Sequence, residues 1–441
     1  MIVIWLVAGG VFFTVYLGLI NVRGFSHGIA LAAGKHKTPD APGEVTQFQA
    51  LATAVSGTVG VGNIAGVAIA ISLGGPGATF WLIAAGLLGM STKFAECTLA
   101  VRYRKTNPDG TVSGGPMYYL EQGLVDLNFP NAGKALGIFY AIAMVIGCLG
   151  IGNMFQSNQA AAIFITVTGG EQSPFMGHAW IVGLVMAVIV AVVILGGIKS
   201  IARVTEKLVP FMALLYSVSA IVIILMNADK LLWAFSAIWQ GAFSPDGVTG
   251  GIIGVIVIGF RRAVFSNEAG LGSASIAHSA VKTNYPATEG YVALLEPFID
   301  TVVVCTLTAL VIITTVYDPL LANSGISGIE MTTRAFQSTL SWSPIPLSIA
   351  AILFAFSTML SWSYYGLKAF TYLFGEGTMT QLTFKIVFCG FIVLGSAAQL
   401  NALIDLSDAL VFIVAIPNLI GLYILAPIVK EEITRYAESR G

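Results

Sequence analysis

The chain has 441 residues, of which 10% are Asp, Glu, Lys or Arg, whereas 56% are hydrophobic and 49 are glycine. A soluble domain usually carries about 25% charged residues, so this composition excludes a cytosolic enzyme and a disordered chain. The formal net charge of −1 offers nucleic acid no basic surface to bind. We therefore predict an integral protein of the lipid bilayer that binds no nucleic acid.

Hydrophobic segments separated by polar breaks predict an all-α polytopic membrane protein with eleven transmembrane helices. A hydrocarbon core of about 30 Å needs about 20 apolar residues per helix. The segments of about this length are 2–20, 47–73, 78–101, 135–166, 179–197, 208–226, 251–278, 290–316, 346–371, 384–400 and 406–428. Because their number is odd, we expect the two termini on opposite sides of the membrane.

The distribution of lysine and arginine predicts the orientation. With the N-terminus outside, the inside segments hold 16 of the 21 basic residues, and the outside segments hold only Lys230 and Arg334. Lys93, Arg261 and Arg262 lie at membrane depth. The positive-inside rule therefore predicts an outside N-terminus and a cytoplasmic C-terminus, in a plasma membrane of the bacterial inner-membrane type. No basic residue precedes the first span, which we interpret as an anchor rather than a cleaved signal peptide.

Three segments outside the predicted spans are expected to form short helices at the membrane surfaces. The outside loops 227–250 and 317–345 are long and carry tryptophan. The inside stretch 114–123 has the pattern of an amphipathic helix. For each of them a packing role and a gating role are both consistent with the sequence.

Two of the predicted spans contain glycine-rich interruptions. One span includes Ser56–Gly66, and another includes Phe265–Gly272. Glycine costs about 1 kcal/mol per helix-interior position relative to alanine, and non-helical backbone at membrane depth occurs only where protein buries it or it lines a cavity. An interruption frees carbonyls that suit a bare cation and amides that suit a carboxylate. The alternative is that these glycines only let neighbouring helices pack closely.

The positions of the two interruptions predict an internal repeat. Each interruption lies in the first member of a set of five spans, and the two sets run in opposite directions because five is odd. We therefore predict a five-plus-five inverted repeat with one extra N-terminal helix. Residues 1–46 would hold the extra helix and a cytoplasmic loop, 47–226 the first repeat, and 227–441 the second repeat with external loop helices and a short cytoplasmic tail.

Five motifs resemble those of the alanine-or-glycine:cation symporter family, also called the sodium:alanine symporter family. They are Thr58-Val-Gly-Val-Gly-Asn-Ile-Ala-Gly66, Gly74-Gly-Pro-Gly-Ala-Thr-Phe-Trp81, Gly114-Gly-Pro-Met-Tyr-Tyr119, Phe265-Ser-Asn-Glu-Ala-Gly-Leu-Gly-Ser273 and Leu295-Glu-Pro-Phe-Ile-Asp-Thr301. The resemblance runs from about residue 45 to the C-terminus. One departure is Leu82-Ile83, where the family usually has Met-Trp, and we expect it to alter the packing of the third span.

The resemblance implies a fold of the sodium-coupled leucine transporter type and a secondary active transporter. The expected activity is symport of sodium with small neutral amino acids, alanine and glycine first, by alternating access. Sodium would be the co-transported ion, and the chain would not be an enzyme. Amino-acid preference, stereoselectivity, sodium stoichiometry and oligomeric state are left open.

Sodium is a hard cation that prefers oxygen ligands, and the resemblance suggests where they lie. The first site would combine the carbonyls of Ser56 and Val59 with the hydroxyls of Ser357 and Thr358. The alternative for the two hydroxyls is a hydrogen bond to their own helix.

A second candidate sodium site would join the carbonyl of Thr58 to the side chains of Asn63 and Ser266. Asp300 or Thr301 would complete it from the eighth span. An ionised Asp300 would hold sodium, whereas a protonated one would only form hydrogen bonds.

The zwitterionic amino acid is expected between the two interruptions. Its carboxylate would accept from the amides of Val61 and Gly62, where the second half of the first interrupted span restarts. Its ammonium would donate to carbonyls around Phe265, Ser266 and Ala269.

Side chains around this position are expected to select small substrates. Asn63 would bridge either charged group of the amino acid. The rings of Phe155, Phe265 and Trp362 would limit the pocket, unless they simply pack in the core, and Gly270 would keep its floor clear.

Polar and charged side chains at membrane depth need partners, because each buried charge costs about 2.5–3.5 kcal/mol on insertion scales. Lys93 and Glu96 lie three residues apart on one helix face, so one interpretation is that they neutralise each other. We expect Glu268 either to tie the second interruption to a neighbouring helix or to form a gate with an arginine. Glu296, Gln156 and Gln159 would line the pathway, or serve only as hydrogen-bonding groups between helices.

The sequence is also consistent with two alternative functions. One is a proton-coupled amino-acid transporter on the same scaffold, in which Glu268, Glu296 or Asp300 titrates. The other is an intramembrane enzyme, which would need a nucleophile and a base close together. The four histidines all lie near the ends of predicted spans, which disfavours the enzyme.

Overall fold

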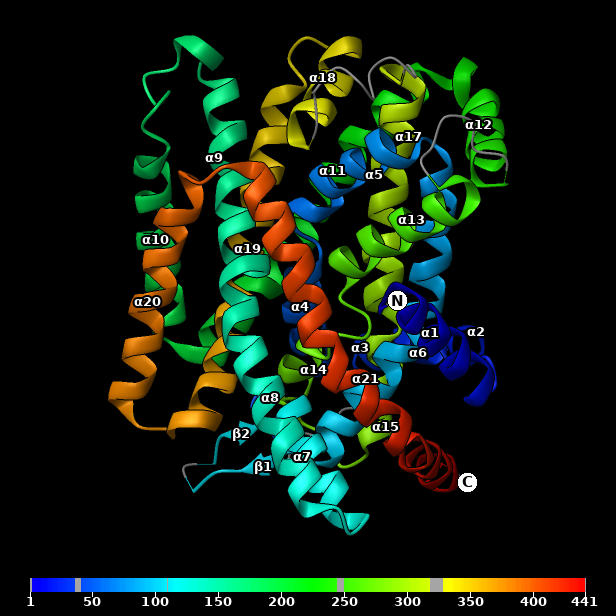
Figure 1. The fold of residues 1–441 in the computed structure, drawn as a ribbon, viewed down its shortest axis with the longest axis vertical. Coiled ribbons are helices and arrows are strands. Elements are labelled where there is room, and N and C mark those ends of the chain that lie inside the picture. Colours follow the sequence, from blue (N-terminus) through cyan, green and yellow to red (C-terminus); the bar gives the residue numbers. More distant parts are fainter. Residues whose placement is uncertain (1, 36–40, 109, 244–249, 318–327, 441) are drawn as a thin grey trace.

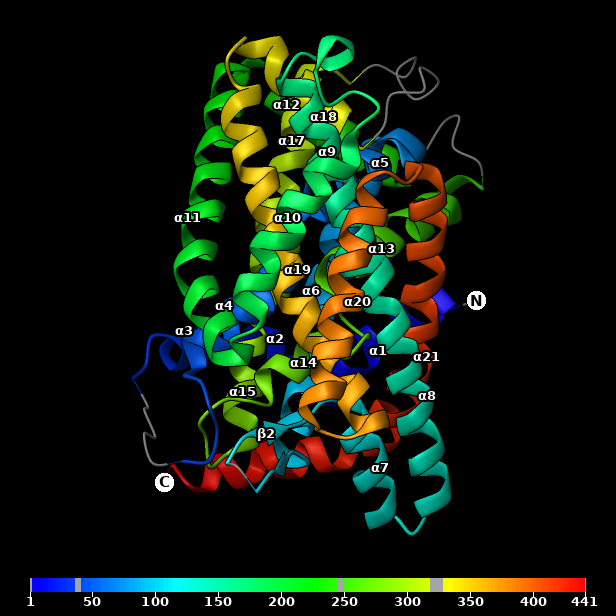
Figure 2. The same ribbon diagram turned by 90° about the vertical axis from the view of Figure 1, so that its left-hand side faces the viewer.

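The computed structural model describes residues 2–35, 41–108, 110–243, 250–317 and 328–440, and these residues are mostly helical. The helices form an elongated bundle in which most axes run along the longest dimension (Figures 1 and 2). Strands β1 (Lys105–Thr106) and β2 (Val112–Ser113) pair antiparallel at one end of the bundle.

Helices of varied length make up the bundle. In chain order the α-helices are α1 (Ile2–Tyr16), α2 (Ile20–Arg23), α3 (Phe25–Ala32), α4 (Gln47–Thr58), α5 (Ala65–Gly74), α6 (Gly77–Arg102), α7 (Pro116–Asp126), α8 (Pro130–Leu149), α9 (Phe155–Val167), α10 (Ala179–Ile194), α11 (Gly197–Met226), α12 (Leu231–Phe243), α13 (Gly251–Asn267), α14 (Ser273–His278), α15 (Pro286–Ala293), α16 (Leu295–Pro297), α17 (Thr306–Thr315), α18 (Ile329–Thr339), α19 (Pro344–Phe374), α20 (Thr378–Ser396) and α21 (Leu400–Glu438). The 3-10 turns are η1 (Val61–Asn63), η3 (Gly170–Gln172) and η4 (Ala228–Lys230), and the π-helical segments are η2 (Gly150–Met154) and η5 (Phe298–Cys305).

Within the described ranges, seven helices are long and apolar enough to cross a membrane. They are Gly77–Arg102, Pro130–Val167, Gly197–Met226, Pro286–Thr315, Pro344–Phe374, Thr378–Ser396 and Leu400–Glu438. Helices α4 and α5 qualify together as one span bent by 56°, and α1 and α10 are shorter apolar helices. Each of the eleven predicted segments holds one helix or several helical elements in succession. The number of crossings stays a prediction.

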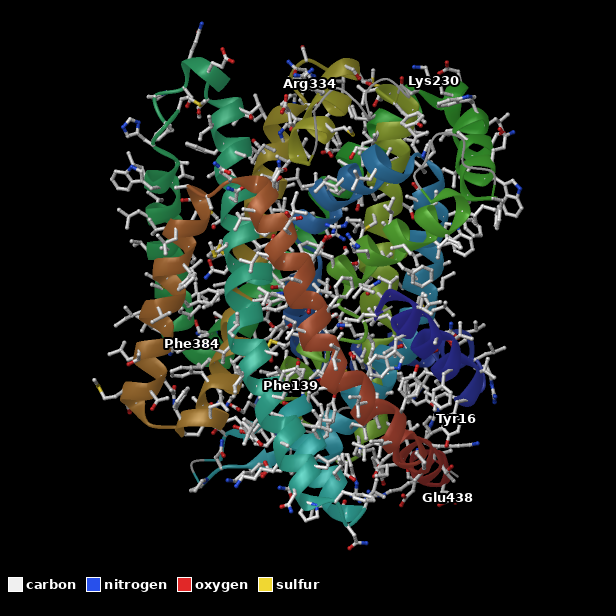
Figure 3. The ribbon with its side chains drawn as sticks, viewed as in Figure 1. Tyr16, Phe139, Lys230, Arg334, Phe384 and Glu438 are labelled. Carbon is white, nitrogen blue, oxygen red and sulfur yellow. The ribbon has the colours of Figure 1, made fainter. Side chains whose placement is uncertain are left out.

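The short surface helices predicted between the spans are present. Helix α12 lies within 227–250, α18 within 317–345, and α7 overlaps 114–123, although residues 244–249 and 318–327 lie outside the described ranges. Lys230 and Arg334 lie at the end of the bundle formed by α12 and α18, opposite Glu438 (Figure 3). The C-terminal helix α21 contains Pro417 and Pro427, and its last turns run across that opposite end (Figure 2).

The packing of the bundle places the two interrupted helices side by side. Helices α4 and α14 pack against each other, as do α5 and α13, so the two interruptions lie next to one another. Helix α19 packs against α4, α8, α9 and α11, while α6 packs against α13 and α15. The two breaks are therefore enclosed by other helices, which is the environment that non-helical backbone requires inside a membrane.

Candidate functional site

The first interruption follows the prediction closely. Helix α4 ends at Thr58, Gly60 has an extended backbone (φ −125°, ψ −164°), and α5 begins at Ala65 after the 3-10 turn η1. The Gly60 amide donates to Oδ1 of Asn63 (2.8 Å), and the Val61 amide donates to Oε1 of Gln156 (3.1 Å). These side-chain oxygens satisfy two amides that the break frees.

The second interruption lies between Asn267, the last residue of α13, and Ser273, the first residue of α14. Its backbone turns through left-handed conformations at Glu268 (φ +58°), Gly270 (φ +94°) and Gly272 (φ +74°). Glycine adopts this conformation at little cost, whereas a glutamate there needs support from its surroundings.

A buried carboxylate from α6 supports this second break. Oε1 of Glu96 accepts from the amides of Gly270 (2.9 Å) and Gly272 (3.0 Å), and from Nδ2 of Asn418 (2.8 Å) in α21. The salt bridge of Lys93 is made with Oε1 of Glu296 at 2.9 Å and not with Glu96. The three-residue spacing of Lys93 and Glu96 is a poor guide because both groups find partners on other elements.

Glu268 ties the break to a neighbouring helix, the first of the two alternatives considered above. Its Oε1 accepts from Nε1 of Trp362 in α19 (2.9 Å), and its Oε2 accepts from the hydroxyl of Ser273. In the part of the chain that the structure describes, the salt bridges made by arginines do not include Glu268. Arg262 instead pairs with Asp408 of α21, with its guanidinium 5.5 Å from the centroid of the Phe265 ring.

The first predicted group of cation ligands comes together between α4 and α19. The hydroxyls of Thr358 and Ser357 lie 3.0 Å and 3.5 Å from the carbonyl oxygen of Ser56. Oγ of Ser56 lies 2.8 Å from Oγ of Ser361 and donates to the carbonyl of Ser357 (2.7 Å). A Cβ on Gly60 would lie 2.5 Å from Oγ1 of Thr358, so only glycine lets this hydroxyl lie so close to the break.

The second predicted group also converges, around Asp300. Its Oδ1 accepts from Nδ2 of Asn63 (2.6 Å), and its Oδ2 accepts from the hydroxyls of Ser266 (2.9 Å) and Thr301 (2.7 Å). All four residues are buried. The carbonyl of Thr58, the remaining predicted ligand, accepts from the Gly60 amide at 2.8 Å.

The predicted size-limiting rings lie at the breaks. The rings of Phe155 and Phe265 meet edge to face with centroids 5.0 Å apart, and the Phe265 ring packs against Gly62. Trp362 is 1% exposed, and a Cβ on Gly152 would lie only 1.9 Å from its indole. The absence of a side chain at Gly152 thus creates the space that the Trp362 ring fills.

Two predicted residues of the second break have other helices beside their Cβ positions. The Cβ of Ala269 lies against Gly89, and a Cβ on Gly270 would meet Leu6 of α1. The space beside Gly270 is therefore taken by Leu6, while the predicted contact of the Ala269 carbonyl with the substrate stays a prediction.

Two of the predicted pathway residues connect elements instead. Oε1 of Gln159 lies 3.4 Å from the amide of Ile329 at the start of α18, and Glu296 belongs to an ionic cluster with Lys93. Val59, whose carbonyl was predicted to bind sodium, directly follows the last residue of α4 at the first break.

Sequence reasoning missed several residues of this region. It gave Gln156 no role at the Val61 amide, and it did not include Ser361 with the hydroxyls of α19 or Asp408 as the partner of Arg262. Two acids, Asp405 and Asp408, near the start of the apolar helix α21 were the available signal for Asp408. The π-helical winding of η2 and η5 was also missed, and η5 carries Asp300 and Thr301. Such π segments are frequent at functional sites.

The chain is similar in sequence and in fold to known proteins. The model of the sodium:alanine symporter family matches residues 1–441. The chain is 40% identical over 436 residues to the sodium/alanine symporter AgcS of Methanococcus maripaludis, covering 99% of this chain and 94% of the relative. It is 32% identical to the amino-acid carrier protein AlsT of Bacillus subtilis, covering 99% and 89%. The crystal structure of MhsT in complex with L-phenylalanine matches with a TM-score of 0.63 at 16% identity, covering 87% of this chain and 89% of that chain, which shows a shared fold.

The role of Glu96 leads to a prediction about stability. Replacing Glu96 with Leu leaves the amides of Gly270, Gly272 and Asn418 without this acceptor, at about 1–3 kcal/mol for each buried group. We expect a large fall in the thermal unfolding midpoint of the purified protein. Glu96→Gln keeps one carbonyl oxygen as an acceptor, so its unfolding midpoint should fall less. The exposed control Glu330→Gln should unfold at the same temperature as the wild type. A Glu96→Leu variant as stable as the wild type would contradict this assignment.

Proposed function

Because the chain belongs to the sodium:alanine symporter family, we propose that it couples the uptake of small neutral amino acids, alanine and glycine first, to the entry of sodium by alternating access. It is a multi-pass membrane transporter and not an enzyme. The observation that carries the proposal is the side-by-side placement of two interrupted helices, with buried oxygen groups at the first break.

The proposed membrane arrangement uses all eleven predicted spans. Residues 47–226 and 227–441 form two inverted repeats, and residues 1–46 form the added helix and loop. The N-terminus lies outside and the C-terminus in the cytoplasm. The end that carries Lys230 and Arg334 is then external, which fits its small number of basic residues (Figure 3).

The first proposed sodium site lies between α4 and α19. Sodium would bind the carbonyls of Ser56 and Val59 and the hydroxyls of Ser357 and Thr358. This placement is supported because the two hydroxyls already approach the Ser56 carbonyl within 3.5 Å, although the Ser357 hydroxyl also donates to the Phe354 carbonyl of its own helix at 3.0 Å. Neutral oxygens suit a weakly charged cation that has to leave again.

The second proposed sodium site lies at Asp300, with Asn63, Ser266 and Thr301. Asp300 is completely buried, and its oxygens accept only from neutral groups in the described structure. An ionised carboxylate in such a place is costly unless a cation accompanies it. Sodium would supply that charge, and the Thr58 carbonyl at the adjoining break would be a further ligand.

The substrate would bind at the Val61–Asn63 turn. The Val61 amide already bonds to a carbonyl-type oxygen of Gln156, so a substrate carboxylate would replace one oxygen acceptor with a charged one. The ammonium would meet carbonyls near Phe265 and Ser266 in the facing break.

Closure on the external side would depend on α13, α18 and α21. The Arg262–Asp408 pair joins α13 to α21 directly over the Phe265 ring. Thr332 of α18 donates to the carbonyl of Ile64 (3.1 Å), at the start of α5. Opening toward the outside therefore requires the ion pair and this hydrogen bond to separate.

The energetics of coupling one sodium ion to one zwitterion are sufficient for accumulation. A membrane potential of 100 mV contributes about 2.3 kcal/mol for the charge moved. A tenfold sodium gradient adds about 1.4 kcal/mol. Together, roughly 3.7 kcal/mol supports a substrate ratio of several hundred-fold.

Sodium coupling can be tested by uptake of labelled alanine into proteoliposomes with an imposed sodium gradient. We expect accumulation that requires sodium and collapses when the gradient is dissipated. Equal uptake after replacement of sodium by potassium or choline would refute sodium coupling. Uptake driven by a pH gradient without sodium would favour the proton-coupled alternative.

The first sodium site can be tested by removing two hydroxyls. In the double variant Ser357→Ala and Thr358→Ala, the ion would lose two of its four proposed ligands. We expect the sodium concentration for half-maximal uptake to rise at least about tenfold, equivalent to about 1.4 kcal/mol. The matched control is Ser363→Ala, whose hydroxyl bonds to the carbonyl of Leu360 in its own helix. An unchanged sodium dependence of the double variant would exclude this site.

The size limit can be tested at Trp362. Replacing it with Leu vacates the space beside Gly152 and removes the donor to Glu268. We expect larger amino acids such as leucine and methionine to become competitors of alanine uptake. Trp342→Leu, at an exposed tryptophan, serves as the control. If the Trp362→Leu variant still excludes leucine while transporting alanine, Trp362 does not set the size limit.

A further inference from the structure

A buried ionic cluster lies on the inner half of the second interrupted helix, outside the proposed sodium sites. His278 ends α14, and its Nδ1 lies 2.6 Å from Oε1 of Glu289 in α15. Its Nε2 lies 3.6 Å from Oε2 of Glu296 in α16, and the other oxygen of Glu296 pairs with Lys93 of α6 at 2.9 Å. All four side chains are 0% exposed. The cluster therefore joins α14 to α15, α16 and α6.

Charge balance within this cluster depends on one proton. Lys93 and an imidazolium at His278 match the two carboxylates of Glu289 and Glu296. A neutral imidazole would leave one uncompensated negative charge, and an uncompensated buried charge is strongly destabilising. An imidazolium donates through both nitrogens, so it can serve the two carboxylates that flank it.

Unsatisfied polar atoms support the same conclusion. In the described residues, Nε2 of His278, Oε2 of Glu289 and Oε2 of Glu296 are buried without a hydrogen-bond partner. These groups therefore have spare capacity to bind and exchange a proton.

The wider surroundings contain more acids than bases. Among the described residues of this inner region, the fully or almost fully buried carboxyl groups are Glu96, Glu268, Glu289, Glu296 and Asp300. Against these five stand the buried Lys93 and His278 and the partly exposed Arg104, whose guanidinium donates to the carbonyls of Ser279 and Val281 and interacts with Glu289. Besides Arg104, the other titratable groups that interact with members of the cluster are Cys97 and Tyr365, while Tyr119 and Tyr140 face Glu96 beside it. Sodium at Asp300 would compensate one carboxylate, and the remaining excess of negative charge favours proton binding.

We propose that His278, Glu289 and Glu296 form a proton-binding site that holds the inner half-helix α14 against α15 and α16. When the site is protonated, His278 bridges the two glutamates. When the proton leaves to the cytoplasmic side at alkaline pH, the bridge carries an excess negative charge and α14 is released. Transport then slows, because α14 is the inner half of the second interrupted helix, whose outer half α13 carries Phe265 and Ser266 of the proposed substrate site. Only this last step depends on the proposed function.

The test combines thermal unfolding of the purified protein with sodium-driven alanine uptake, both over about pH 6 to 10, around and above the ordinary histidine pKa. We expect both to decline toward alkaline pH in the wild type. Loss of one linked proton lowers the folded-to-unfolded ratio by up to about tenfold per pH unit. His278→Gln should be less stable than the wild type at acid pH, with the pH dependence lost. The exposed histidine variant His178→Gln should follow the wild type.

Two further variants keep the test decisive if His278→Gln does not fold. In Glu289→Gln, the charges of Lys93 and Glu296 cancel when His278 is neutral. The unfolding midpoint and the uptake rate should therefore depend less on pH than in the wild type. The double variant His278→Gln and Glu289→Gln restores charge balance, so it should be more stable than His278→Gln alone.

Two results would overturn the proton site. One is a wild-type pH profile retained in Glu289→Gln or His278→Gln. The other is no stabilisation of the double variant over His278→Gln. Absence of sodium-dependent uptake at every pH would instead overturn the proposed function, and the unfolding profiles would still decide the proton site.

Discussion

The structure depends on satisfying backbone amides and carbonyls where two membrane helices are interrupted. Inside a bilayer water is not available to these groups, and each one left unpaired costs several kcal/mol. At the first break, Asn63 and Gln156 supply oxygen acceptors, and at the second break Glu96 supplies one oxygen to two amides. The acceptors come from α9 and α6 as well as from the break itself. The surrounding helices therefore hold the irregular backbone that the transport site would use.

The sequence predicted the positions of the breaks because glycine content and span length are local properties. It also identified the residues that converge on Asp300, through the motifs that resemble a known family. It failed where the partner lies far along the chain. Lys93 and Glu96 share a helix face, but they bind Glu296 and Asn418, each more than two hundred residues away. A helical spacing rule cannot anticipate such tertiary pairing.

Backbone winding was also beyond the reach of the sequence. Hydrophobic periodicity identified the spans at 135–166 and 290–316, but a π-helical segment changes the direction of side chains without changing composition. The assignment of Gly270 failed for a related reason. An interruption of the helix was expected from the glycine-rich motif, but the direction in which the turn faces is set by the packing of Leu6 and Leu419 against it. Those two residues lie on α1 and α21, and neither is a neighbour in sequence.

The cluster of four hydroxyls between α4 and α19 shows how such a site can bind an ion reversibly. Ser56, Ser357, Thr358 and Ser361 are buried and hydrogen-bonded to one another or to backbone carbonyls. A sodium ion entering this group would therefore exchange O–H···O contacts for ion–oxygen contacts, and the oxygens would remain paired in both states. Because an unpaired buried hydroxyl is costly, this exchange removes a penalty that would otherwise oppose ion release. The same reasoning applies to the Val61 amide, which has an oxygen acceptor in Gln156 and would keep one when a carboxylate takes that place. A transporter has to release what it binds, and paired donors and acceptors in both states make release energetically accessible.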